Sequence, residues 1–135
     1  MTERVDRCRV LVVDDDPMMK SVLRLVLNEI GAEVVGEAEN GSEAVDLFKE
    51  HSPDVTLLDF EMPVQNGFQT LTDIRKLNSE SPIVMLTGND NPAIAGACIG
   101  HGANDYIGKG QTPAELLEVL RSKFISMKLI DHAPA

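Results

Sequence analysis

The sequence predicts an α/β fold in which a parallel sheet of five strands is covered by helices on both faces. Short apolar runs alternate five times with stretches of helical periodicity. The apolar runs are nearly continuous, which is typical of parallel strands buried on both faces. The chain has 135 residues, enough for one domain with its own core. Right-handed connections then give a doubly wound three-layer sandwich, with its ligand site at the carboxyl ends of the strands.

The first half of the chain supplies three strands and two helices. The run "RVLVV" predicts the first strand, and the helix after it ends near Gly31, a residue typical of a helix C-cap. The run "EVVGEA" predicts the second strand, and "SEAVDLFKE" a helix with Ala44, Val45 and Phe48 on one face. The third strand, "DVTLLD", ends on Asp59. The apolar positions of the first helix are Met19, Val22, Leu23, Val26, Leu27 and Ile30.

The second half repeats the alternation. "PIVMLT" and "DYIG" predict the fourth and fifth strands. "NPAIAGACIGHG" predicts a helix with Asn91 as N-cap and Pro92 in its first position. In "TPAE", Thr112 and Glu115 have the spacing of a capping box that begins the last helix. The apolar positions are Phe68, Leu71, Ile74 and Leu77 in the third helix, and Leu116, Leu117, Leu120, Phe124 and Met127 in the last.

The composition of the chain excludes several classes of function. The formal net charge of -10 argues against binding nucleic acid or an anionic membrane through a basic face. Cys8 and Cys98 have no motif spacing, so we expect two reduced, buried thiols. No apolar run has the length of a membrane span or a signal peptide, and a cytoplasmic protein is expected. Residues 1–130 form the predicted domain, and 131–135 ("DHAPA") a loose C-terminal tail.

Three consecutive carboxylates follow the first strand in "VLVVDDDP". Such neighbours resist ionisation unless something positive holds them. Asp16 stands directly before Pro17, so we expect Asp16 to cap the next helix. Asp14 and Asp15 are then left beside Asp59 as an oxygen cluster suited to Mg²⁺.

Two further polar residues are expected at the same edge of the sheet. Thr87 ends the fourth strand, and Lys109 follows the fifth. The carboxyl ends of parallel strands share one edge, so we expect the acids, this hydroxyl and this ammonium group to converge.

This pattern resembles the response-regulator receiver domain, the chemotaxis-protein fold with flavodoxin-like sheet order 2-1-3-4-5. The resemblance covers nearly the whole chain and is carried by "LVVDDD", "LLDFEMPVQNG", "VMLTG" and "GANDYIGKG". The second of these is the most specific. It places Pro63 four residues after Asp59, and Gly67 four residues after the proline.

The resemblance implies a role in two-component signal transduction. A sensor histidine kinase or a histidine phosphotransfer protein would donate a phosphoryl group with Mg²⁺ as cofactor. The fourth helix, fifth strand and fifth helix would meet a downstream protein, with neither nucleic acid nor membrane as partner. The domain would be no enzyme, although it would assist its own phosphorylation and dephosphorylation. The implied roles are phosphoacceptor for Asp59; Mg²⁺ ligands for Asp14, Asp15, Asp59 and the main-chain carbonyl of Glu61; phosphoryl sensing for Thr87; phosphate contact for Lys109; and switch aromatic for Tyr106.

Two departures and two alternatives remain. Gly110 replaces the usual proline after Lys109, so a trans bond is expected there, since a non-proline cis bond costs about 2.5–4 kcal/mol. Gly96 indicates either an easily remodelled fourth helix or close packing against the sheet. A receiver that only binds proteins, unphosphorylated, is one alternative function. A Mg²⁺-dependent phosphatase with an aspartyl nucleophile is the other, although Glu61 stands where that motif has a second aspartate.

Overall fold

The structure is a computed structural model that describes residues 7–62, 67–88 and 91–131. In this part of the chain, five strands alternate with five helices, as the sequence predicts. The elements are β1 (Cys8–Val13), α1 (Pro17–Glu29), β2 (Ala32–Ala38), α2 (Gly41–His51), β3 (Val55–Asp59), α3 (Gly67–Leu77), β4 (Ile83–Thr87), α4 (Pro92–Gly100), β5 (Asp105–Gly108) and α5 (Pro113–Ser126).

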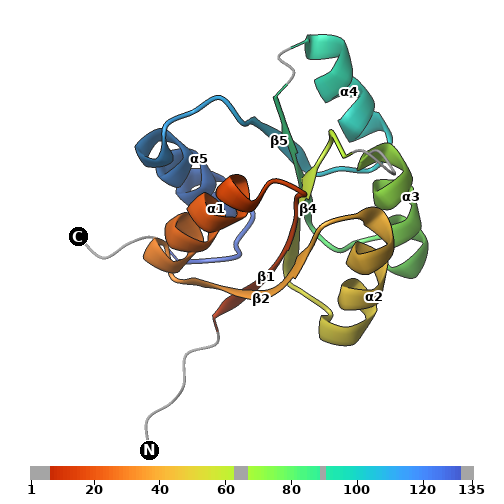
Figure 1. Ribbon diagram of the computed structural model, residues 1–135, viewed down its shortest axis with the longest axis horizontal. Coiled ribbons are helices and arrows are strands. Elements are labelled where there is room, and N and C mark those ends of the chain that lie inside the picture. The colour runs from red at the N-terminus through yellow and green to blue at the C-terminus, as the bar shows by residue number, and fades with distance from the viewer. Residues whose placement is uncertain (1–6, 63–66, 89–90, 132–135) are drawn as a thin grey trace, which may run out of the picture.

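The strands form one parallel sheet in the order β2-β1-β3-β4-β5 (Figure 1). This confirms the predicted doubly wound fold. Strand order reverses at β1, because the chain moves outward to β2 and then crosses back to β3. Such a reversal places a crevice at the carboxyl ends of the central strands.

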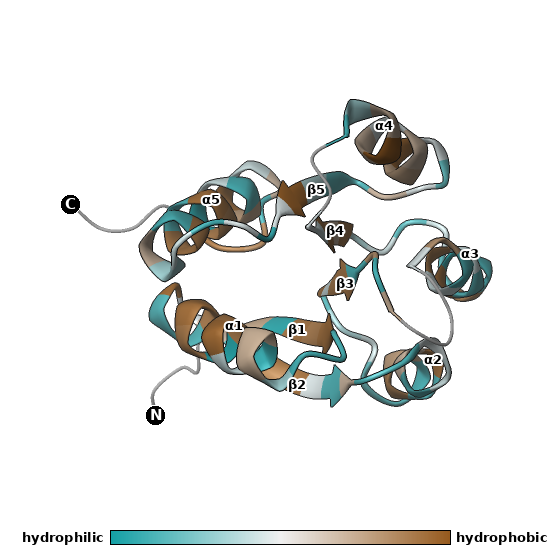
Figure 2. Ribbon diagram, turned by 45° about the horizontal axis from the view of Figure 1, so that its top comes forward, coloured by the Kyte–Doolittle hydropathy of each residue, from teal (hydrophilic) through white to brown (hydrophobic). Residues whose placement is uncertain are grey.

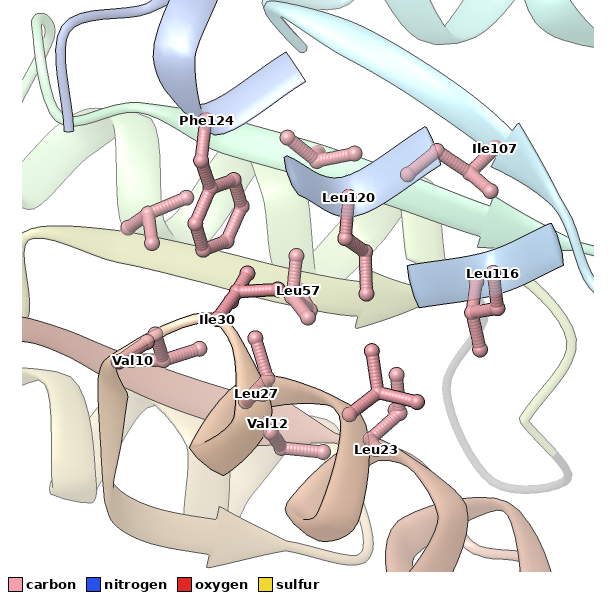
Figure 3. Close-up of a cluster of buried hydrophobic side chains, with 14 of the residues drawn as sticks. Val10, Val12, Leu23, Leu27, Ile30, Leu57, Ile107, Leu116, Leu120 and Phe124 are labelled. Atoms are coloured by element: carbon pink, nitrogen blue, oxygen red, sulfur yellow. The ribbon is translucent and has the colours of Figure 1, made fainter. Parts of the chain in front are cut away.

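Helices α1 and α5 cover one face of the sheet, and α2, α3 and α4 cover the other (Figure 2). Alternate residues of a strand point to opposite faces. In β1, Val10 and Val12 therefore pack with the first pair of helices, whereas Leu11 and Val13 pack with the other three. Figure 3 shows the first core, where side chains of α1 and α5 meet those of the sheet.

The predicted helix starts are confirmed. Asp16 accepts a hydrogen bond from the Met18 N–H at 3.0 Å, and Asn91 accepts one from the Ala93 N–H at 2.9 Å. Both hydrogen bonds of the Thr112 capping box are present. After α1, Gly31 has φ +88°, a left-handed conformation that suits glycine.

Some details of the helices differ from expectation. In α2, Leu47 rather than Val45 joins Ala44 and Phe48 in the core. In α3, Leu77 is exposed, because it lies in the last position of the helix.

Helix α4 decides between the two interpretations of Gly96. A Cβ atom at Gly96 would meet nothing within 4 Å. Close packing against the sheet is therefore the wrong explanation for this glycine. The helix is also apolar on every side: Ala95 and Cys98 are buried, whereas Ile99 is 45% exposed.

Both cysteines are buried free thiols, as expected. None of the helices in the described ranges has the length and apolar character that a membrane span requires.

Candidate functional site

The carboxyl ends of four strands bring distant polar residues together. Asp14 follows β1, Asp59 and Thr87 are the last residues of β3 and β4, and Lys109 follows β5. The Lys109 Nζ atom lies 3.1 Å from Asp14 Oδ2 and 3.2 Å from Asp59 Oδ1. The predicted convergence of acids and ammonium group is therefore observed.

Asp14 and Asp59 are held by backbone groups in a nearly solvent-free position. Asp14 is fully buried, and its Oδ1 accepts a hydrogen bond from the Asp16 N–H at 2.9 Å. Asp59 is 1% exposed, and its Oδ1 accepts one from the Glu61 N–H at 3.1 Å. Asp15, the residue after Asp14, is exposed. The loop after β1 thus points one acid inward and leaves the next in solvent.

The buried negative charges of these residues outnumber the positive charge beside them. Burial, and then the charge of Asp14, raise the pKa of Asp59 from 3.8 to about 6, although Lys109 acts in the opposite direction. Burial alone lowers the pKa of Lys109, but Asp59 and Asp14 outweigh burial and raise it. Lys109 therefore stays charged, and one ammonium group faces two buried acids.

The acids have the donor set of a divalent cation site. One carboxylate oxygen each from Asp14, Asp15 and Asp59 lies within 4.8 Å of the others. Asp59 Oδ2 is buried and has no hydrogen-bond partner among the described residues. A buried carboxylate oxygen without a partner is costly, and a hard cation such as Mg²⁺ would satisfy it. The residues present therefore fit Mg²⁺.

Gly67 explains one part of the motif around Asp59. A Cβ atom on Gly67 would lie 2.8 Å from the Phe60 Cα and 2.9 Å from the Asp59 carbonyl oxygen. The Gly67 N–H also donates to the Phe60 carbonyl at 2.9 Å. Only glycine lets the start of α3 pack this closely against the end of β3. Pro63 of the same motif lies outside the described residues.

A second group of contacts surrounds Thr87. The Thr87 hydroxyl donates to Glu61 Oε2 at 3.0 Å, and the Gly88 N–H donates to Glu61 Oε1 at 3.1 Å. From the sequence, only the main-chain carbonyl of Glu61 was expected in the site, and its side chain was missed. The signal for it was an acid two residues after Asp59, on the loop that faces the end of β4.

Tyr106 and Gly110 lie at the border of the site. Tyr106 is 43% exposed and lines a cleft of about 300 Å³ beside Thr87, Gly88 and Lys109. The bond between Lys109 and Gly110 is trans, as expected, because the described residues contain no cis peptide bond.

Comparisons of sequence and structure show which known proteins this chain resembles. Residues 10–121 match the family model of the response regulator receiver domain. The chain is 37% identical over 112 residues to the chemotaxis protein CheY of Thermotoga maritima, covering 83% of this chain and 93% of that protein.

Two solved structures show the same fold. One is the signal receiver domain of the putative response regulator NarL from Mycobacterium tuberculosis, with a TM-score of 0.77, 32% identity, and coverage of 88% of this chain and 97% of that one. The other is the CheX-CheY complex with BeF3 and Mg from Borrelia burgdorferi, with a TM-score of 0.79, 27% identity, and coverage of 86% and 88%.

Proposed function

The chain belongs to the response regulator receiver family, and on that premise we propose that Asp59 is the residue that accepts the phosphoryl group. The observation that carries the assignment is the position of Asp59. It is a buried carboxylate at the end of a central strand, in contact with Lys109, and its second oxygen has no hydrogen-bond partner among the described residues. The unphosphorylated receiver is not favoured, because the acids and the lysine that a phosphoacceptor site needs are all present. The phosphatase is not favoured, because the matching family is one of two-component signalling.

The transfer uses the charges around Asp59. A phosphohistidine of the kinase or phosphotransfer partner presents its phosphorus to the carboxylate, a P–O bond forms, and the P–N bond breaks as the imidazole nitrogen keeps the electron pair. Lys109 neutralises charge on the transferring group. Although burial and the charge of Asp14 raise the pKa of Asp59 to about 6, the carboxylate is still mostly ionised, and hence nucleophilic, at neutral pH. We assign to the same site the later attack of water, which releases inorganic phosphate.

Asp14, Asp15, Asp59 and the main-chain carbonyl of Glu61 are the proposed protein ligands of Mg²⁺. When bound, the ion would supply Lewis-acid charge in addition to that of Lys109. Asp16 has a different role, because its side chain caps α1.

The proposed output passes through Thr87 and Tyr106. Thr87 turns its hydroxyl to an oxygen of the acyl phosphate, and Tyr106 moves into the cleft beside Thr87. The surface formed by α4, β5 and α5 then changes shape and binds a downstream protein.

Labelling with a small phosphoryl donor tests the assignment of Asp59. Acetyl phosphate with Mg²⁺ should add one phosphoryl group to the wild type, detected by intact mass. Asp59→Asn should abolish the labelling, whereas Asp46→Asn, on the exposed face of α2, should leave it unchanged. Undiminished labelling of Asp59→Asn would refute the proposal.

A further inference from the structure

The carboxylate of Glu61 is held by two hydrogen-bond donors at the end of β4. One of its oxygens accepts from the Thr87 hydroxyl and the other from the Gly88 N–H, at 3.0 and 3.1 Å. Thr87 is almost fully buried, whereas Glu61 belongs to an exposed loop. The side chain therefore folds back over the sheet edge toward these donors.

We propose that the Glu61 side chain is an internal competitor of the phosphoryl group. It occupies Thr87 and Gly88 in the unphosphorylated state and must leave them before an acyl phosphate on Asp59 can use them. The inference rests on the proposed function and adds a residue that determines how readily Asp59 is modified.

The chemistry of the contact supports this role. A carboxylate and a phosphoryl group both present anionic oxygens, and both accept short hydrogen bonds from O–H and N–H donors. A Cβ atom at Gly88 would lie 3.9 Å from Glu61 Oε1, so the carboxylate fills the space beside this glycine. Because Asp59 pairs with Leu86 in the sheet, a group attached to Asp59 would lie near this end of β4.

The position of Glu61 relative to Asp59 places the carboxylate and a phosphoryl group in competition for the same donors. The Glu61 N–H donates to Asp59 Oδ1 at 3.1 Å, so the backbone of Glu61 is fixed beside the phosphoacceptor. Its side chain then reaches from this loop to Thr87 and Gly88 at the end of β4. A phosphoryl group on Asp59 would bring a second set of negative oxygens to the same donors, and like charges repel.

The charge of Glu61 also reaches α4. The pKa of the buried Cys98 thiol is raised, first by burial and then by the charge of Glu61. Displacement of the carboxylate would therefore change the field at α4 as well as the hydrogen bonds of Thr87.

A purely structural role for Glu61 predicts the opposite result. If the side chain only tied the loop after β3 to β4, its removal would loosen the site and weaken phosphoryl binding. If the side chain competes, its removal strengthens phosphoryl binding. The sign of the effect separates the two roles.

Beryllofluoride binding with saturating Mg²⁺, followed by ¹⁹F NMR, tests the proposal. Glu61→Ala should bind beryllofluoride on the order of tenfold more tightly than the wild type, because the analogue no longer has to displace a charged hydrogen-bond acceptor. Glu61→Gln keeps the length of the side chain but loses its charge, and should fall between the two.

Glu43→Gln is the matched control. Glu43 Oε1 also accepts a backbone N–H, from Glu39 at 2.7 Å, but the residue belongs to α2 rather than to the loop beside Thr87. This variant should bind beryllofluoride as the wild type does. The amide resonance of Gly88 in metal-free protein gives a second readout. It should move upfield in Glu61→Ala and stay in place in Glu43→Gln.

The possible failures are distinguishable. If the wild type binds beryllofluoride and Glu61→Ala binds it equally or more weakly, the competition is wrong and the proposed function stands. An unmoved Gly88 resonance in Glu61→Ala overturns the competition as well. If neither protein binds beryllofluoride or accepts a phosphoryl group, the proposed function fails and the competition fails with it.

Discussion

The site has two halves with opposite electrostatic states. The acid half contains Asp14, Asp15, Asp59 and Lys109, and in it the acids outnumber the ammonium group and Asp59 Oδ2 has no hydrogen-bond partner in the described part of the chain. The anion-binding half contains the Thr87 hydroxyl and the Gly88 N–H, which already hold the Glu61 carboxylate. One half needs a positive charge, whereas the other is already satisfied.

This difference indicates how one covalent event would act on the fold. A cation in the acid half relieves repulsion, whereas a phosphoryl group must break existing contacts in the anion-binding half. The acid half leads into α1, whose buried Leu23, Val26 and Leu27 anchor it in the core. The anion-binding half leads into α4, which is shorter and buries only Ala95 and Cys98 among its described side chains. Movement is therefore expected at α4.

The largest predicted effect comes from removing one of the negative charges of the acid half. Asp59→Asn should stabilise the metal-free protein at pH 7 by up to about 3 kcal/mol. The reason is that the pKa of this carboxyl rises from 3.8 to about 6 on folding, and each pKa unit corresponds to about 1.4 kcal/mol. Between these two values the folded wild type binds more protons than the unfolded chain. Its stability should therefore fall as the pH rises from 4 to 6.

Denaturant unfolding at pH 4 and pH 7 measures this effect. The advantage of Asp59→Asn should be small at pH 4 and fully developed above pH 6. Added Mg²⁺ should stabilise the wild type at pH 7 and reduce the difference. An advantage that does not depend on pH would contradict the electrostatic explanation.

The acid half could be predicted from the sequence better than the anion-binding half, for a physical reason. The backbone of a parallel sheet fixes where strand ends lie, so Asp14, Asp59 and Lys109 of the acid half could be placed from strand patterns alone. The direction of the Glu61 side chain depends on a loop conformation and on donors from another strand. Val45 and Leu47 show the same limit, because both fit the helical pattern of α2 and only packing selects Leu47.

The second prediction separates two neighbouring acids. Asp15→Asn should weaken Mg²⁺ binding on the order of tenfold, because it removes one negative charge from the acid half. Asp16→Asn should have little effect, since Asp16 caps α1 and asparagine caps a helix about as well. Calorimetric Mg²⁺ titration of both variants measures the difference. Equal losses in the two variants would contradict the division of the three acids into ligands and a cap.

The third prediction sharpens the contrast between α1 and α4. Gly96→Ala should stabilise the protein by about 1 kcal/mol, because alanine favours a helix over glycine and nothing lies within 4 Å of its Cβ position. Gly31→Ala, after α1, should destabilise it by about 1–2 kcal/mol, because alanine is strained at φ +88°. Thermal unfolding of the two variants should shift in opposite directions. A loss of stability in Gly96→Ala would mean that the backbone of α4 needs this glycine.

The smallest predicted effect concerns the response of α4 to the phosphoryl analogue. Beryllofluoride with Mg²⁺ should change amide hydrogen exchange in α4 and β5 by about fivefold, which corresponds to about 1 kcal/mol of local opening free energy. The cause is the transfer of Thr87 and Gly88 from Glu61 to the new anion, next to the Asn91 cap of α4. Helix α2 packs mainly on β2, β1 and α3, begins at its own Asn40 cap, and should hardly respond.

Gly96→Ala provides the internal check on this response. If α4 moves because its conformations are close in free energy, a more stable helix should respond less to the same beryllofluoride occupancy. Mg²⁺ alone should fill the acid half and leave Glu61 on its donors, so it should protect the loops around Asp14 and Asp59 without changing α4. Changes centred on α2, or an α4 response to Mg²⁺ alone, would show that the two halves do not act separately. In the second case, the α4 response would have to originate in the acid half, through α1 or the sheet. It would not originate in the exchange of one anion for another at Thr87.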